Sequence, residues 1–174
     1  MRLAIGMTLL AAMAGAQTNP AAVAARAWRT GHERAIVDEF TGLLAIPNIA
    51  SDKANIQRNA EAIAAMMAQR GVASRLVSVP GGNPVVFGEL RTPGATRTIV
   101  FYAHYDGQPL DPKEWATPPF TPTLLNRKLE DGGQAIPLPQ GAFDPESRIY
   151  ARGSADDKAP IVAMMTALDS IRAA

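Results

Sequence analysis

The sequence contains no cysteine and only two histidines, His32 and His104. Disulfides and thiolate metal sites are therefore excluded, and any metal ion would have to be bound by His, Asp or Glu. A strong charge of one sign is also lacking, because 17 Lys and Arg against 16 Asp and Glu leave a formal net charge of +1. Without an excess or a stripe of basic residues, nothing favours nucleic acid as a partner. With 47% hydrophobic and 19% charged residues, the 174-residue chain instead has the composition of a globular domain.

A hydrophobic run long enough to cross a bilayer is missing as well. Residues 3–13 (LAIGMTLLAAM) are apolar, but a spanning helix needs about 20 such residues. Arg2 precedes this run and the small residues 14–16 (AGA) follow it, which is typical of a secretory signal peptide. We therefore predict a signal peptide over residues 1–16, a mature chain over 17–174, a secreted or periplasmic location and no stable membrane anchor. A buried N-terminal helix is the alternative interpretation.

Helical spacing of apolar residues marks three segments of the chain. Residues 20–45 follow this period, with a break allowed at Gly31. A second helix is predicted from an N-cap at Asp52 to about residue 70, where Gly71 ends it. The period returns from Pro160, which suits the first turn of a helix because it has no N–H to lose. Each of these helices carries an apolar stripe that must be buried against another element.

Between the second and third helical segments the period changes to that of strands. Strands are predicted over residues 72–79, 85–90 and 98–103, and the last is apolar on both faces, as in a buried central strand covered by helices. Residues 108–148 contain eight prolines and are predicted to form a long surface excursion with one hairpin. Helices combined with a central strand predict an α/β sandwich whose site lies at the strand ends.

The predicted strand over residues 98–103 leads into a histidine and an aspartate two residues apart, His104 and Asp106. In extended chain, side chains two residues apart point to the same face. His104 can then present one ring nitrogen to a metal ion while Asp106 accepts the proton of the other nitrogen, which fixes the tautomer. A His-x-Asp triplet is common, but its place at the end of an apolar strand favours a metal-binding role.

Two adjacent carboxylates, Asp156 and Asp157, come just before the last predicted helix. The positive end of a helix favours ionised carboxylates nearby by about 0.3–1 kcal/mol. Capping of the helix is one interpretation, and it requires only one of the two. A metal site is the other, because a single aspartate can bridge two ions about 3.5–4 Å apart that share an attacking hydroxide. The two motifs together predict half of a metal site.

The two motifs, HYDGQP over residues 104–109 and ARGSADDKAP over 151–160, resemble the N-terminal signatures of the dinuclear-zinc peptidases that include carnosinase, nonspecific dipeptidases, carboxypeptidase G and aminoacylase. The proline that closes each motif is most similar to the dipeptidase–carnosinase branch. The resemblance extends from about Val37 through Ile171. It implies the N-terminal part of a catalytic domain that is a three-layer α/β sandwich, with helices on both faces of a mixed sheet.

By position, the resemblance implies that His104 is a terminal ligand of one zinc ion and that Asp156 bridges two ions, with a cis peptide bond directly after it. Asp106 would be the catalytic carboxylate that orients His104 and tunes the metal. Two Zn²⁺ ions would fill a complete site, with Co²⁺ or Mn²⁺ as substitutes. The implied reaction is hydrolysis of a peptide or amide bond by a metal-bridged water, in a dipeptidase that is a homodimer at full length.

The family's Glu-Glu pair, its further acidic ligand and its late histidine have no counterpart in this sequence. We therefore expect the N-terminal portion of a longer metallopeptidase, without its C-terminal part and its dimerisation domain, and inactive by itself. An N-acyl-amino-acid amidohydrolase of the same family and a catalytically inactive truncated module are the alternatives. Phosphoryl transfer on a Mg²⁺-binding Asp-Asp pair is disfavoured, because the glycines at 81–82 are not followed by the Gly-Lys-Ser/Thr of a phosphate-binding loop.

Overall fold

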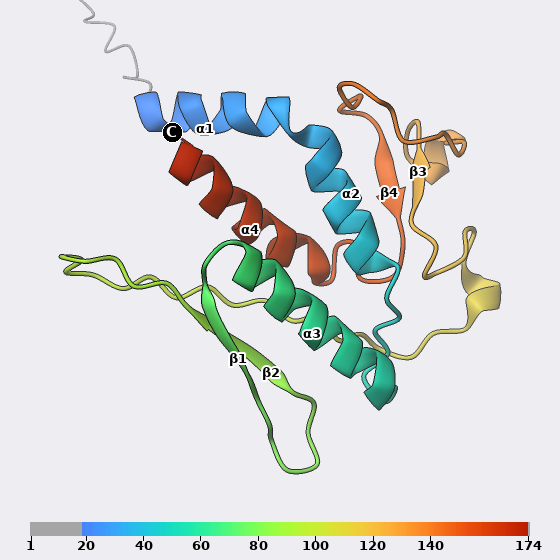
Figure 1. Ribbon diagram of the computed structural model, residues 1–174. Coiled ribbons are helices and arrows are strands. Elements are labelled where there is room, and N and C mark those ends of the chain that lie inside the picture. Colours follow the sequence, from blue (N-terminus) through green and yellow to red (C-terminus); the bar gives the residue numbers. More distant parts are fainter. Residues whose placement is uncertain (1–18, 174) are drawn as a thin grey trace, which may run out of the picture.

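Four helices make up most of the fold of this computed structural model, which describes residues 19–173 (Figure 1). They are α1 (Pro20–Gly31), α2 (Glu33–Leu44), α3 (Lys53–Gln69) and α4 (Lys158–Ala173). The helical periods of the sequence predicted all four, including the division of the first segment at Gly31. The predicted signal peptide lies outside the described residues.

Local capping interactions fix the ends of these helices. The Asn19 side chain accepts a hydrogen bond from the Ala21 amide at the start of α1, and the Asp52 side chain accepts one from the Asn55 amide at the start of α3. Gly71 follows α3 with φ = 63°, a left-handed conformation that glycine adopts without steric cost. The predicted N-cap and the predicted stop of α3 are thus confirmed. α4 begins two residues earlier than its proline suggested, with Pro160 in the first turn.

The hydrophobic core lies where α2, α3 and α4 meet. Both α1 and α2 pack against α4, and α3 packs against the strands that follow it. Burial of a Leu, Ile or Met side chain contributes roughly 1.5–3 kcal/mol each, so this cluster is the main source of stability. Its buried members are Leu43, Ile63, Met66, Ile161, Val162 and Met165.

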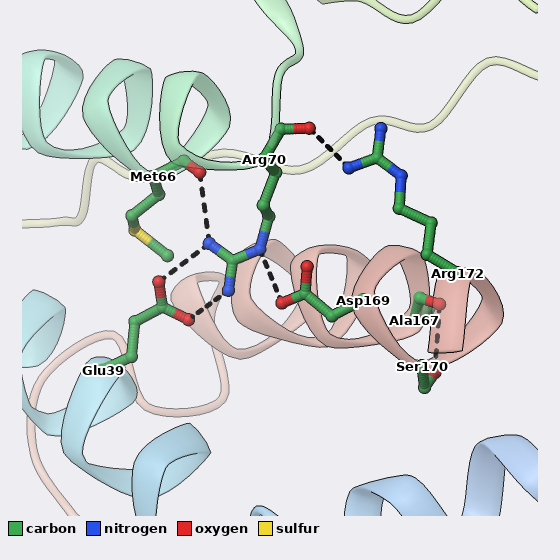
Figure 2. Close-up of polar contacts among 7 residues, drawn as sticks. All are labelled: Glu39, Met66, Arg70, Ala167, Asp169, Ser170 and Arg172. Carbon is green, nitrogen blue, oxygen red and sulfur yellow. Dashed lines mark hydrogen bonds and ion pairs between the residues drawn. The ribbon is translucent and has the colours of Figure 1, made fainter. Parts of the chain in front are cut away.

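An ion-pair cluster joins the same three helices (Figure 2). Arg70, the residue that ends α3, donates from Nε to Asp169 Oδ2 of α4 at 2.8 Å. Its two terminal nitrogens donate to the two carboxylate oxygens of Glu39 of α2, both at 2.9 Å. The Arg70 side chain is only 12% exposed. Paired, charge-assisted hydrogen bonds of this kind are among the stronger polar contacts in proteins, so this Arg70 cluster fixes the mutual orientation of the helices.

The strands form two separate antiparallel pairs within residues 19–173. β1 (Ala73–Val77) pairs with β2 (Val85–Glu89), and β3 (Thr123–Leu125) pairs with β4 (Arg148–Tyr150). The α/β class is confirmed, and so are the first two predicted strands. The hairpin predicted within residues 108–148 differs from the structure, because the partner of β3 is β4, at the end of that segment and beyond it. The three-layer sandwich around a mixed sheet is not confirmed by these small sheets.

The predicted buried central strand over residues 98–103 is wrong for the described structure. This stretch has no strand partner there, and its apolar side chains are 70–85% exposed, namely Ile99, Val100, Phe101 and Tyr102. A central strand needs a hydrogen-bonded neighbour on each edge and a covering layer on each face. The described residues supply neither of these around this stretch.

The segment between residues 108 and 148 is irregular, as its prolines predicted. Besides β3 it contains two short 3₁₀ helices, Pro112–Glu114 and Leu129–Asp131. Its return strand β4 leads directly into the turn before α4, and so carries the chain back to the second motif. In the described part of the chain, no helix is both long and apolar enough to cross a lipid bilayer.

Candidate metal centre

The two sequence motifs meet in space. His104 Nε2 lies 2.9 Å from Asp156 Oδ1, so the end of the 98–103 stretch contacts the turn before α4. A tetrahedral metal ion with bonds of about 2.0–2.2 Å to a histidine nitrogen and a carboxylate oxygen holds those two atoms roughly 3.3–3.6 Å apart. The two predicted metal ligands are in direct contact, a few tenths of an ångström closer than a shared ion would hold them.

Asp106 lies on the other side of the imidazole. His104 Nδ1 donates to the main-chain carbonyl oxygen of Asp106 at 3.0 Å, and Asp106 Oδ1 lies 3.4 Å from the same nitrogen. Because a carbonyl oxygen only accepts hydrogen bonds, this contact places the proton on Nδ1 and leaves Nε2 free to face Asp156. The nearer partner of His104 Nδ1 is thus the Asp106 main chain, whereas the sequence predicted its carboxylate, and the catalytic role of Asp106 stays a prediction.

Three carboxylates surround His104 and change its protonation. Asp157 accepts a hydrogen bond from the His104 amide through Oδ2 at 3.2 Å, which makes it a second link between the motifs. Burial by itself lowers the pKa of His104, but the hydrogen bond to the Asp106 carbonyl and the charges of Asp156, Asp157 and Asp106 outweigh it and raise that pKa above its ordinary value. A site that attracts a proton in this way also attracts a metal cation.

The neighbouring lysine does not neutralise these carboxylates. Lys158 is fully buried, and its Nζ donates to the carbonyl oxygens of Leu43 and Ile46, each at 2.8 Å. Burial lowers the pKa of Lys158 to about 7. The last turn of α2 contains no basic residue of its own, so Lys158 supplies the donors that its C-terminal carbonyls need. The side chain supports the fold and points away from the acidic cluster.

The types of donor atom fit zinc, but there are too few of them to complete a zinc site. Catalytic zinc takes an imidazole and carboxylates among three protein ligands, and His104 with Asp156 provides two donors. Nowhere in residues 19–173 does a group of three or more His, Asp or Glu side chains have an arrangement that could hold a metal ion.

The peptide bond between Asp156 and Asp157 is cis, as the resemblance implied. The other histidine, His32, is exposed and stacks on Trp28.

Two residues near the site, Asp157 and Asn48, make contacts that the sequence did not predict. Asp157 was interpreted only as a partner of Asp156 or a helix cap, although its contact with the His104 amide links the motifs. Asn48 is fully buried and donates from Nδ2 to the Tyr105 carbonyl oxygen at 2.9 Å. No sequence pattern indicates an asparagine that binds a main-chain carbonyl 57 residues away.

The part of the chain that contains both motifs is similar to a known protein family. Residues 100–174, which contain both motifs, match peptidase family M20/M25/M40. The recognition of metallopeptidases of this kind from the two motifs is confirmed.

Individual relatives are dipeptidases and one desuccinylase. The chain is 27% identical over 88 residues to a Cys-Gly metallodipeptidase of Schizosaccharomyces pombe, an alignment that covers 50% of this chain and 14% of that protein. It is 31% identical over 91 residues to a Beta-Ala-His dipeptidase of Homo sapiens, covering 52% and 14% respectively. A succinyl-diaminopimelate desuccinylase of Acidovorax ebreus is 38% identical over 81 residues, covering 46% and 16%.

A solved structure shares the fold. The dipeptidase Dug1p from Saccharomyces cerevisiae superimposes with a TM-score of 0.66 at 20% sequence identity, over 87% of this chain and 31% of that one. The chain therefore corresponds to about a third of this structural relative, and its alignments cover about one seventh of the curated relatives.

Proposed function

We propose that this chain contributes half of the active site of a metal-dependent hydrolase of peptide bonds, a dipeptidase that works with two zinc ions. The observation that carries the proposal is the 2.9 Å contact between His104 Nε2 and Asp156 Oδ1, two side chains from separate motifs. The match to a peptidase family over these motifs supports it, and so do the relatives named as dipeptidases.

In this proposal each residue of the site has a distinct role. His104 Nε2 and the Asp156 carboxylate hold the metal, and Asp106 keeps the proton of His104 on Nδ1 so that Nε2 stays available. Zinc bound here would lower the pKa of a water toward neutrality and polarise the scissile carbonyl; Co²⁺ or Mn²⁺ would serve in its place. A catalytic zinc takes three protein ligands, so the remaining ligands and the general base come from other segments of a longer enzyme. Alone, the chain is inactive.

A second candidate keeps the chemistry and changes the substrate to an N-acyl amino acid. The desuccinylase among the relatives favours it, because that protein has a higher identity to this chain (38%) than the human dipeptidase (31%) has. Both candidates use the same metal and the same attack on an amide carbonyl. They differ in what binds on either side of the scissile bond.

The wider architecture follows from the same proposal. In the longer enzyme the exposed residues 99–102 would become a central strand of a mixed sheet with helices on both faces, which would bury their apolar side chains. Homodimer formation through a separate domain, export directed by residues 1–16 and the absence of a membrane anchor complete the proposal.

The decisive experiment compares the two histidines of the chain. Zinc is titrated into the metal-free full-length enzyme and into its His104→Ala and His32→Ala variants, with binding measured by calorimetry. We expect His104→Ala to weaken zinc binding at least 100-fold and His32→Ala to leave it unchanged, because His32 stacks on Trp28 away from the motifs. Equal affinities in all three proteins would contradict the metal site.

Activity separates the two candidate substrates. The full-length enzyme is assayed with dipeptides and with N-acyl amino acids, each with and without a chelator. Hydrolysis of dipeptides that a chelator abolishes and zinc restores supports the dipeptidase, whereas selective hydrolysis of N-acyl amino acids supports the amidohydrolase. Hydrolysis that is indifferent to chelation rules out both.

A further inference from the structure

One short connector touches both motif loops. It consists of residues 45–52, between α2 and α3, and Asn48 lies in its middle. On the side of the first motif, the Gly107 amide donates to the Asn48 carbonyl oxygen at 2.6 Å and the Ala50 amide donates to the Gly107 carbonyl oxygen at 2.9 Å. With the Asn48 Nδ2 bond to the Tyr105 carbonyl, the connector holds the main chain on both sides of Asp106.

The same side chain lies against the second motif. A Cβ atom built on Gly153, which has φ = 79°, would lie 3.0 Å from Asn48 Nδ2. A Cβ atom built on Gly107 would lie 3.2 Å from the same nitrogen. Asn48 is therefore packed between two glycines, one from each motif. Any larger residue at either glycine would displace it.

The end of the second motif is held by the same stretch of main chain. Lys158, two residues after Asp156, donates to the carbonyl oxygens of Leu43 and Ile46, and its own amide donates to the Gly153 carbonyl oxygen at 3.0 Å. Contacts with the segment from Leu43 to Ala50 thus determine where both proposed metal ligands stand. The Asn48 side chain lies against both motif loops.

Stability alone does not account for Asn48. Its Oδ1 atom is buried without a hydrogen-bond partner among the described residues, and such a group destabilises a fold. Asn59 offers a matched comparison, because it is equally buried, has the same unpaired Oδ1 and donates to the connector at the Pro47 carbonyl. The two asparagines differ in that Asn59 has no hydrogen bond to either motif.

We propose that Asn48 is a positioning residue that sets the separation of His104 and Asp156 and thereby the affinity of the site for a metal ion. The affinity part rests on the proposed function, whereas the separation is a property of the metal-free chain. Asn48 acts through the main chain of Tyr105 and Gly107, and does not contact the metal or the substrate.

The test uses Asn48→Ala and Asn59→Ala in the full-length enzyme, with Asn48→Ser as a milder variant that keeps a shorter donor. Zinc affinity is measured by calorimetry, and the distance from His104 Nε2 to Asp156 Oδ1 is measured in crystal structures of the metal-free proteins. We expect Asn48→Ala to weaken zinc binding about tenfold or more, as loss of a partner that orients a ligand does, and Asn48→Ser to have an intermediate effect. Asn59→Ala should lower the melting temperature comparably and change the zinc affinity less than twofold.

The two measurements separate the two proposals. If the wild-type full-length enzyme binds no zinc, the proposed function fails, and a His104–Asp156 distance that lengthens in Asn48→Ala but not in Asn59→Ala still supports the positioning role. If Asn48→Ala keeps the wild-type distance and affinity, or if both variants change them equally, the positioning role is overturned. Should Asn48→Ala not fold, the same comparison is made with Asn48→Ser.

Discussion

The Arg70 cluster and the site around His104 both gather acidic side chains, but only the first contains a permanent cation. Glu39 and Asp169 share one guanidinium at 2.8–2.9 Å, and both carboxylates are 24% exposed. Asp106 and Asp156 are 43% and 77% exposed. Within residues 19–173, each of these two has His104 as its ion-pair partner, and neither has a lysine or arginine. In the folded chain, Arg70 neutralises part of the charge of the first group, whereas no arginine or lysine among the described residues pairs with Asp106 or Asp156.

This difference indicates what each group is for. A partly buried arginine with its carboxylates already in place joins helices and has no free capacity for another ion. Carboxylates that face an imidazole while the nearby Lys158 donates to α2 keep their negative charge available. Solvent reduces their mutual repulsion until a cation arrives. The comparison therefore predicts that removing a charge will change the stability of the chain strongly at the Arg70 cluster and only slightly at the site around His104.

Removal of the cation should have the largest effect on stability. Arg70→Met leaves Glu39 and Asp169 without a partner at the junction of three helices, so we expect the free energy of unfolding to fall by about 2–3 kcal/mol. Urea denaturation followed by circular dichroism measures this. Arg91→Met is the control, because Arg91 pairs with Glu89 while 85% exposed and such surface pairs contribute about 0–1 kcal/mol. Equal losses in the two variants would show that the Arg70 cluster is no stronger than a surface pair.

Removal of one carboxylate from each group should further distinguish the Arg70 cluster from the site around His104. Asp169→Asn weakens a charge-assisted bond to Arg70 and should destabilise the chain by about 1–2 kcal/mol. Asp156→Asn removes a carboxylate that is 77% exposed and pairs with His104, so the stability of the metal-free chain should change by less than about 1 kcal/mol. The same variant should lose zinc affinity, which calorimetry detects. A large loss of stability in metal-free Asp156→Asn would mean that Asp156 has a structural role instead.

Asp52 provides a third case, a carboxylate stabilised mainly by hydrogen bonds, with a smaller contribution from the charge of Arg58. The pKa of Asp52 is lowered first by the hydrogen bond from the Asn55 side chain and then by the one from the Asn55 amide. Because the unfolded chain then binds a proton more readily, this contribution to stability is present above the unfolded pKa of about 4 and is lost as the pH falls through the folded value. Asp52→Asn keeps an acceptor that does not titrate. The stability difference between wild type and Asp52→Asn should therefore change below about pH 4, by a small amount, in thermal melts at several pH values.

Much of the fold could be predicted because its information is local. The apolar period of α1 to α4, the cap at Asp52 and the turn at Gly71 each lie within a few residues of the structure that they determine. The stretch from Ile99 to Tyr102 was misjudged because apolar residues on both faces indicate a need for burial without saying which segment provides it. Hydrophobicity is not directional, so it cannot name a partner.

For the candidate site, too, the residues of short motifs could be predicted and the contacts between distant segments could not. His104, Asp106 and Asp156 could be predicted as site residues because a metal needs particular donors in a short motif. The buried ammonium of Lys158 at the end of α2 and the amide of Asn48 beneath Tyr105 were not assigned these contacts. Both bind main-chain carbonyls of distant segments, and every residue in a sequence offers such a carbonyl. Contacts of this kind become visible only when the chain is folded.

The uncovered stretch from residue 98 to residue 103 (TIVFYA) has a practical consequence for all of these measurements. It is uncharged and contains no proline, it is rich in β-branched and aromatic residues, and most of its apolar surface meets solvent. Segments of this composition stack into intermolecular sheets when they are accessible. At high concentration the isolated chain should self-associate here, so that dilute samples, or a lysine placed at Val100 as a gatekeeper, would keep it monomeric.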